Sequence, residues 1–311
     1  MRESKGKFIV KFRGVRGSHP TPEFNFLEYG GNTACVEVNV NGHLIILDAG
    51  TGIIKCGNEL MKDYAAQVKK EPIEATILLS HVHNDHIQGL PFFKPVHINT
   101  SKINIVGFSD YDEGLDNVIS TLVFEKSFPL TLNDLNAKLS FYDISDNYAL
   151  VLDEENSNPV MRKIQSDEDY IPQGEEVIIS CLKSNSHPKE GVMIYKISYK
   201  DKSLVYATDT EGFVGANKKL VLFARGTDLL IHDAQYTSEE YLNSYFSKQG
   251  YGHSTFDMAL ETFSQAKAKS LAFFHLDPNY SDEFLLDIEK HYTHNCSDCF
   301  IPKEGQEIVL L

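Results

Sequence analysis

Short apolar runs separated by turn residues divide most of this chain into strands and helices. Apolar and polar residues alternate over 35–40, Asn41-Gly42 supplies a turn, and the apolar run 44–47 returns. An Asn-Gly pair between two such runs is a strong signal for a β-hairpin. The spacing of apolar residues then becomes helical from 52 to about 69, and a short apolar run follows at 76–79.

The rest of the chain alternates between strands and helices, more clearly in its last third than in its middle. We expect strands at 102–106, 138–143, 149–152, 177–182, 192–199, 203–207, 229–232, 271–274 and 307–311. We expect helices at 115–123, 254–267 and 281–292. Acidic and amide residues leave only weak periodicity between 129 and 175. Because no repeat or Gly/Ser/Pro linker divides the chain, the pattern predicts one layered α/β domain over 1–311, with an insertion at about 109–175.

The composition is that of a folded protein with an acidic surface. Apolar residues make up 42% and charged residues 23% of the 311 positions, which excludes a disordered, collagen-like or coiled-coil chain. The 29 basic and 44 acidic side chains give a net charge of −15, a field that repels polyanions. No apolar stretch approaches the roughly 20 residues that cross a bilayer, and the first residues lack the apolar core of a signal peptide. We therefore expect a cytoplasmic protein that does not contact a membrane.

The cysteines do not suggest a disulfide framework. There are five, and an odd, sparse set fits a reducing compartment. Cys296 and Cys299 form a CxxC pair, but no second pair accompanies it, and a zinc site normally needs four ligands. We interpret the two residues as thiols on a C-terminal turn, with a metal or redox role as the alternative.

The densest cluster of chemically active residues is the segment 81–86, HVHNDH, which holds three imidazoles and a carboxylate directly after an apolar strand. His81 and His83 leave the strand on the same side because side chains alternate along a strand. Asp85 and His86 lie beyond the bend and can face a second point. Such ligands suit zinc and other borderline divalent metals. The alternative is a histidine-rich surface loop, which the buried strand in front of the motif disfavours.

Four residues cannot complete two coordination shells, so further ligands must come from elsewhere in the chain. Three ionisable residues follow apolar strands in the same way, namely His187, Asp209 and His275. Taken singly, each is more often a surface or capping residue than a ligand. Their repeated position, taken together with the first motif, favours a shared metal site.

This order of residues resembles that of the metallo-β-lactamase superfamily, in which HxHxDH after a strand is followed by a lone His, a lone Asp and a late His. Further matching segments are 29–33 (YGGNT), 47–52 (LDAGTG), 206–211 (YATDTE), 252–255 (GHST) and 274–278 (FHLDP). The set looks like the phosphodiesterase branch, which includes ribonuclease Z and cyclic-nucleotide phosphodiesterases. The resemblance implies an αβ/βα four-layer sandwich of two mixed sheets flanked by helices. No family motif falls within 109–175.

The resemblance also implies a binuclear metal centre. His81, His83 and His187 would hold one divalent ion, Asp85, His86 and His275 would hold the other, and Asp209 would bridge the two. Zinc is the first candidate, with manganese or iron as alternatives. Two such ions share a hydroxide and clamp a phosphoryl oxygen, and the Asp85 carboxylate would also orient that hydroxide as a catalytic group.

The same resemblance gives three residues outside the ligand set supporting roles. Asp48 would accept a hydrogen bond from a ligand imidazole, the alternative being a helix N-cap. His253 would protonate the leaving oxygen as a general acid, the alternative being that His253 and Ser254 only cap the next helix. Asp233 would hold the imidazole of His253 in place.

These features predict a metal-dependent hydrolase, with a phosphodiesterase for a small, cyclic phosphodiester as the first choice. Flavodiiron proteins of the superfamily carry Glu where this chain has His83, so hydrolysis is favoured over oxygen reduction. A lactonase or thioesterase, a nuclease of the ribonuclease Z type and a catalytically silent binding protein are the alternatives, although no expected ligand is missing. The acidic charge and the lack of a recognisable RNA-gripping arm disfavour structured nucleic acid as a partner. A homodimer is compatible with the sequence.

Overall fold

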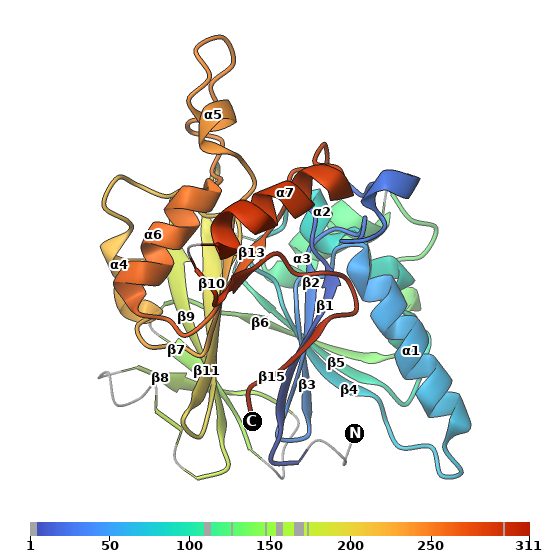
Figure 1. Ribbon diagram of the computed structural model, residues 1–311. Helices are drawn as coiled ribbons and strands as arrows, with labels where there is room; N and C mark the ends of the chain where they lie inside the picture. The colour runs from blue at the N-terminus through green and yellow to red at the C-terminus, as the bar shows by residue number, and fades with distance from the viewer. Residues whose placement is uncertain are drawn as a thin grey trace.

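The computed structural model describes residues 5–108, 113–125, 127–146, 148–153, 158–164, 171–172, 174–294 and 296–311. Two β-sheets face each other, and helices cover their outer faces (Figure 1). This arrangement confirms the four-layer α/β sandwich expected from the sequence.

The first sheet has the strand order β15-β1-β2-β3-β4-β5-β6. Its strands are β1 (Phe8–Gly14), β2 (Cys35–Val40), β3 (His43–Leu47), β4 (Glu74–Leu78), β5 (Lys102–Gly107), β6 (Lys138–Asp143) and β15 (Glu307–Val309). Strands β15, β1, β2 and β3 pair antiparallel, and β3 to β6 pair parallel. Helix α1 (Gly52–Ala66) lies on the outer face of this sheet (Figure 1).

The second sheet has the strand order β14-β13-β12-β11-β10-β9-β7-β8. Its strands are β7 (Tyr148–Leu152), β8 (Val160–Lys163), β9 (Val177–Ser184), β10 (Val192–Tyr199), β11 (Lys202–Ala207), β12 (Leu229–Asp233), β13 (Leu271–Phe274) and β14 (Cys299–Phe300). The four strands β11 to β14 are parallel, and the remaining pairs are antiparallel. Its outer face is covered by α4 (Lys218–Phe223) and α6 (Phe256–Ala266).

Further helical elements lie in the connections between strands of the same sheet. These are α2 (Asn84–Ile87), α3 (Leu115–Ile119), α5 (Ser238–Tyr241), α7 (Asp282–Thr293), the 3₁₀ turns η2 (Phe24–Phe26), η3 (Leu90–Phe92), η4 (Lys94–His97) and η6 (Leu132–Asp134), and the π-helical turn η5 (Ser120–Glu125). The main core lies between the sheets, where Phe12 of β1 packs on Phe274 of β13 with ring centroids 6.3 Å apart. A second core lies between the first sheet and α1.

Most elements fall where the sequence predicts them, but two deserve correction. Strand β1 was not expected, because Lys11 and Arg13 give its segment a charged character. In the fold these side chains point towards α1 and form ion pairs with Glu59, while Phe8, Val10 and Phe12 enter the core. The helix expected at 115–123 is α3 continued by the π-helical turn η5. Within the stretch 109–175, β6 forms an edge of the first sheet, and β7 and β8 belong to the second sheet.

The expected pair of thiols near the C-terminus is wrong, since Cys296 and Cys299 are joined in a disulfide. The turn after α7 brings their Cα atoms to 5.4 Å, within the range that a disulfide spans. Cys35, Cys56 and Cys181 are buried and unbonded. None of the helices in the described ranges is both long and apolar enough to cross a membrane.

Candidate metal centre

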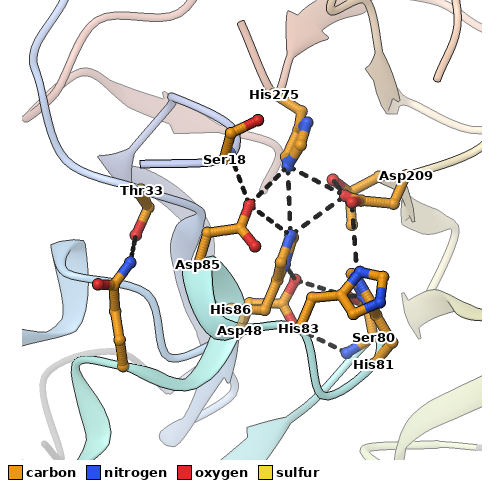
Figure 2. A network of polar contacts seen from close by, with 12 residues as sticks. Ser18, Thr33, Asp48, Ser80, His81, His83, Asp85, His86, Asp209 and His275 are labelled. Carbon is orange, nitrogen blue, oxygen red and sulfur yellow. Dashed lines mark hydrogen bonds and ion pairs between the residues drawn. The ribbon is translucent and has the colours of Figure 1, made fainter. Parts of the chain in front are cut away.

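Strands from both sheets end at one edge of the sandwich, and the candidate ligands follow these strand ends. Segment 81–86 follows β4, Asp209 follows β11 and His275 follows β13. Asp209 and His275 have φ angles of 51° and 59°. Positive φ is uncommon for residues other than glycine, and such backbone geometry is concentrated at functional sites. The turned backbone directs side chains from different strands toward one point (Figure 2).

The first group of candidate ligands consists of His81, His83 and His187. One ring nitrogen from each lies within 4.8 Å of the others. Nε2 of His187 is 3.0 Å from Nδ1 of His83. The opposite nitrogen of His187, Nδ1, lies 3.0 Å from the carbonyl oxygen of Gly252, an acceptor that leaves Nε2 free of a proton.

The second group consists of Asp85, His86 and His275. Oδ2 of Asp85 lies 3.3 Å from Nε2 of His86 and 3.2 Å from Nε2 of His275. The two imidazole nitrogens are themselves 3.2 Å apart. The backbone N–H of Ser18 donates to the same Asp85 oxygen at 2.7 Å and fixes its position.

Asp209 lies between the two groups, and its two oxygens face in different directions. Oδ1 is 3.6 Å from Nε2 of His81 and 3.7 Å from Nε2 of His187. Oδ2 is 3.3 Å from Nε2 of both His86 and His275. A carboxylate placed in this way can contribute one oxygen to each of two adjacent cations.

The donors present fit divalent metal ions. Nε2 of His81 is buried and has no hydrogen-bond partner, although a buried polar atom normally has one. Burial and the neighbouring His86 hold the pKa of His81 well below its usual value, and burial lowers the pKa of His83 to about 4. Both imidazoles are therefore neutral at pH 7, the form that binds metal.

The charges around the second group also favour a bound cation. Burial alone would lower the pKa of His86, but the nearby carboxylates, of which Asp209 acts most strongly, raise it well above its usual value. Burial alone would raise the pKa of Asp209, but His275 and the other imidazoles hold it well below its usual value. The carboxylates therefore stay ionised and stabilise positive charge between them.

Asp48 contacts His86 of the second group and does not cap α1. Its Oδ2 lies 2.8 Å from Nδ1 of His86 and accepts a hydrogen bond from the Tyr206 hydroxyl at 2.8 Å. The backbone and hydroxyl of Ser80 also donate to this carboxylate. The residue that precedes α1 is Thr51, which makes no side-chain cap bond. The contact therefore fixes the orientation of the imidazole of His86, a candidate ligand.

His253 lies beside both groups, and Asp233 holds it. Nδ1 of His253 is 2.8 Å from Oδ2 of Asp233, and its ring stacks on that of His275 with centroids 4.9 Å apart. The same Asp233 carboxylate accepts hydrogen bonds from the backbone of Asp209 and of Ser254. The N-cap of α6 is Thr255, which accepts a hydrogen bond from the backbone of Met258. Capping of this helix therefore does not account for His253.

Sequence reasoning missed several residues that complete the site. Gln235 contacts Nδ1 of His275 through Oε1 at 3.1 Å and donates to the Ser18 hydroxyl. Gly17 lies so close to the ring of His275 that a Cβ atom there would be 2.3 Å from it. Glu211 accepts hydrogen bonds from the Tyr241 hydroxyl and from the backbone of Gly250 and Gly252, which precede His253 in the chain. Only Glu211, within the Thr-Asp-Thr-Glu segment, carried any signal in the sequence.

A cavity of about 480 Å³ opens beside the first group of ligands. His81 and His83 form part of its wall, and apolar side chains such as Val82 and Leu122 form another part. Lys189 and Glu190, which follow His187 in the chain, also line it. A small substrate can therefore reach the candidate ligands.

The chain belongs to the beta-lactamase superfamily, since the family model described as "Beta-lactamase superfamily domain" matches residues 43–276. It is similar to ribonuclease Z of Pyrococcus horikoshii, with 23% identity over 97% of this chain and 95% of the relative. Among solved structures, the metallo-beta-lactamase fold protein YhfI of Bacillus subtilis has a TM-score of 0.65 at 16% identity, over 97% of this chain and 99% of that one. A diphosphatase from the PhnP family has a TM-score of 0.61 at 14% identity, over 97% of both chains.

These matches define the class of protein. The chain is a metal-dependent hydrolase of the metallo-β-lactamase superfamily, in its ribonuclease Z-like branch. The family and the ligand clusters together indicate divalent metal binding.

Proposed function

We propose that this hydrolase is a phosphodiesterase with two metal ions that acts on a small phosphodiester, with a cyclic nucleotide as the leading candidate. The observation that carries the proposal is the position of Asp209, whose two oxygens face two separate ligand groups. Seven candidate ligands are too many for one tetrahedral ion. Zinc is the first candidate for both sites, with manganese or iron as alternatives.

The residues of the chain have distinct roles in this proposal. When bound, two divalent ions supply hydroxide at neutral pH and positive charge for the phosphoryl oxygens. Asp85, fixed by the backbone of Ser18, orients the attacking oxygen. The contact between Nδ1 of His253 and Asp233 leaves Nε2 to donate a proton to the leaving oxygen. The adjoining cavity gives a small ester access to the candidate ligands.

A nuclease of the ribonuclease Z type is the second candidate, because similarity to ribonuclease Z extends over 97% of the chain. This similarity weighs against the expectation that structured nucleic acid is disfavoured as a partner. The net charge of −15 supports the small substrate, since proteins that bind a nucleic-acid backbone draw much of their affinity from surface cations. A cytoplasmic location and a homodimer remain predictions.

The test compares substrates on one protein preparation. Purified protein, reconstituted with zinc and separately with manganese, is assayed on 3′,5′-cyclic AMP, other cyclic phosphodiesters, a precursor transfer RNA, a lactone and a thioester. We expect the highest kcat/KM for a cyclic phosphodiester, and loss of that activity in Asp209→Asn. Efficient RNA cleavage that collapses when salt is raised would overturn the small-substrate proposal, because it would reveal a basic docking surface. Preferential turnover of the lactone or thioester would overturn the phosphodiesterase proposal.

A further inference from the structure

A protruding segment beside the candidate metal centre carries exposed aromatic side chains. The segment, residues 238–251, begins with α5 and stands out from the edge of the sandwich (Figure 1). We call it the aromatic arm. The side chain of Tyr245 is 97% exposed, that of Phe246 is 63% exposed, and Leu242 and Tyr251 are also exposed. Exposed apolar side chains grouped in this way typically mark a binding site.

A single cation lies among the rings of the arm. Nζ of Lys248 is 4.9 Å from the ring centroid of Phe246 and 5.5 Å from that of Tyr251. It is also 5.3 Å from the ring of Tyr236, which precedes the arm in the chain. Contacts of this kind hold the ammonium group in place by attraction to the ring faces. The arm therefore presents an ammonium group among aromatic faces, while its two carboxylates, Glu239 and Glu240, lie in α5 at its start.

Ring contacts connect the arm to the candidate active site through the buried side chain of Tyr236. The ring of Tyr236 makes an edge contact with that of His253, with centroids 5.9 Å apart. His253 in turn stacks on His275. Tyr236 thus links Lys248 and the arm to the proposed general acid and to a ligand of the second group.

Glu211 fixes the arm to the turn that carries Asp209. One of its oxygens accepts hydrogen bonds from the Tyr241 hydroxyl at 2.6 Å and from the backbone of Gly250 at 2.7 Å, and the other accepts from the backbone of Gly252 at 3.1 Å. Gly252 has a φ of 87° and lies against His187, where a Cβ atom would be 2.3 Å from Nδ1. Both ends of the arm are therefore held at fixed positions relative to the metal ligands.

We propose that the aromatic arm binds the nucleobase of a nucleotide substrate by stacking on Phe246 and Tyr245, with Lys248 supplying positive charge beside the ester. The inference rests on the proposed function, because a phosphodiester at the metal ions places the remainder of the molecule next to His253. Aromatic side chains stack on any base, so the arm selects nucleotides over other phosphate esters without selecting one base strongly.

A second copy of the chain is a less suitable occupant of this surface. The buried centres of protein interfaces are depleted in lysine, whereas Lys248 lies in the middle of the arm's rings. Two copies that each carry −15 also repel one another. A nucleotide offers an aromatic face for the rings and negative charge for the lysine.

The test measures binding separately from turnover. The affinity of the metal-loaded protein for adenosine 5′-monophosphate and for ribose 5-phosphate is measured by calorimetry, because these ligands share the phosphate and differ by the base. We expect Phe246→Ala combined with Tyr245→Ala to weaken adenosine monophosphate binding about tenfold or more and to leave ribose phosphate binding almost unchanged. The matched control is Phe24→Ala, which removes a 94% exposed ring from η2, outside the arm.

The outcomes separate this inference from the proposed function. Equal affinity of the wild-type protein for the two ligands, equal losses for both in the arm variant, or the same loss in Phe24→Ala would overturn the inference. Conversion of a dimer into a monomer by the arm substitutions, with nucleotide binding unchanged, would overturn it in favour of self-association. Absence of phosphodiesterase activity together with arm-dependent binding of adenosine monophosphate would overturn the proposed function and support the arm as a nucleotide site.

Discussion

The carboxylate of Asp48 lies 2.8 Å from Nδ1 of His86, although the two residues are 38 positions apart in the chain. The contact directs the other ring nitrogen, Nε2, toward Asp85 and Asp209. A carboxylate behind a ligand imidazole fixes the tautomer and makes the imidazole a stronger ligand. Asp48 has a φ of 61°, so the chain adopts an uncommon backbone geometry to place this carboxylate.

We expect Asp48→Asn to weaken metal binding about 10–100-fold while the fold is retained, because the loss of such a supporting carboxylate typically has this effect. Competition with a chromophoric chelator measures the change. Asp63→Asn, on the exposed face of α1, is the control and should bind metal like the wild-type protein. Unchanged affinity in Asp48→Asn would contradict the supporting role.

The wild-type protein should carry close to two metal ions per chain, and Asp209→Ala should lose both. The reason is that the two oxygens of Asp209 face the two ligand groups separately. Elemental analysis after reconstitution with zinc and with manganese measures the content. One ion or none in the wild-type protein would count against a binuclear site. Full metal content and full activity in Asp209→Ala would show that the bridging role is wrong.

His253→Ala should lower turnover without changing metal content, because His253 contacts Asp233 and lies outside the seven proposed ligands. Loss of a general acid typically costs about 10²–10⁴-fold in rate for esters with poor leaving groups. The effect should be much smaller for bis(p-nitrophenyl) phosphate, whose leaving oxyanion needs little protonation. Equal losses for good and poor leaving groups would assign His253 to substrate positioning.

Glu37→Gln should destabilise the protein by about 3 kcal/mol, because it removes the buried partner of a buried guanidinium and leaves Arg13 only the partly exposed carboxylate of Glu59. Glu37 and Arg13 are both buried, and their closest side-chain atoms are 2.5 Å apart. Urea unfolding at constant metal content measures the change in the free energy of unfolding. The control is Glu74→Gln, which breaks an exposed pair with Lys102 and should cost less than about 1 kcal/mol. Similar costs for the two variants would contradict the importance of burial.

Local patterns in the sequence were sufficient to predict most elements and the metal-binding motif. Period-two alternation and an Asn-Gly turn define the hairpin of β2 and β3, because both signals depend on neighbouring residues. His81, His83, Asp85 and His86 lie within six positions, so their common location required only a strand followed by a bend. The family resemblance then supplied partners that spacing alone could not.

The tertiary structure decided which distant residues meet and through which atoms. Strand β1 pairs with both β2 and β15. Its charged side chains form ion pairs with α1, so the residue that neutralises them lies outside the local sequence. Gln235, Tyr206 and the backbone of Ser18 join the site through single hydrogen bonds between segments far apart in sequence. Residue types such as these occur everywhere on protein chains, so only their positions in space distinguish them. The sequence by itself therefore determined the chemistry available to this protein, whereas the packing of two sheets against each other determined its geometry.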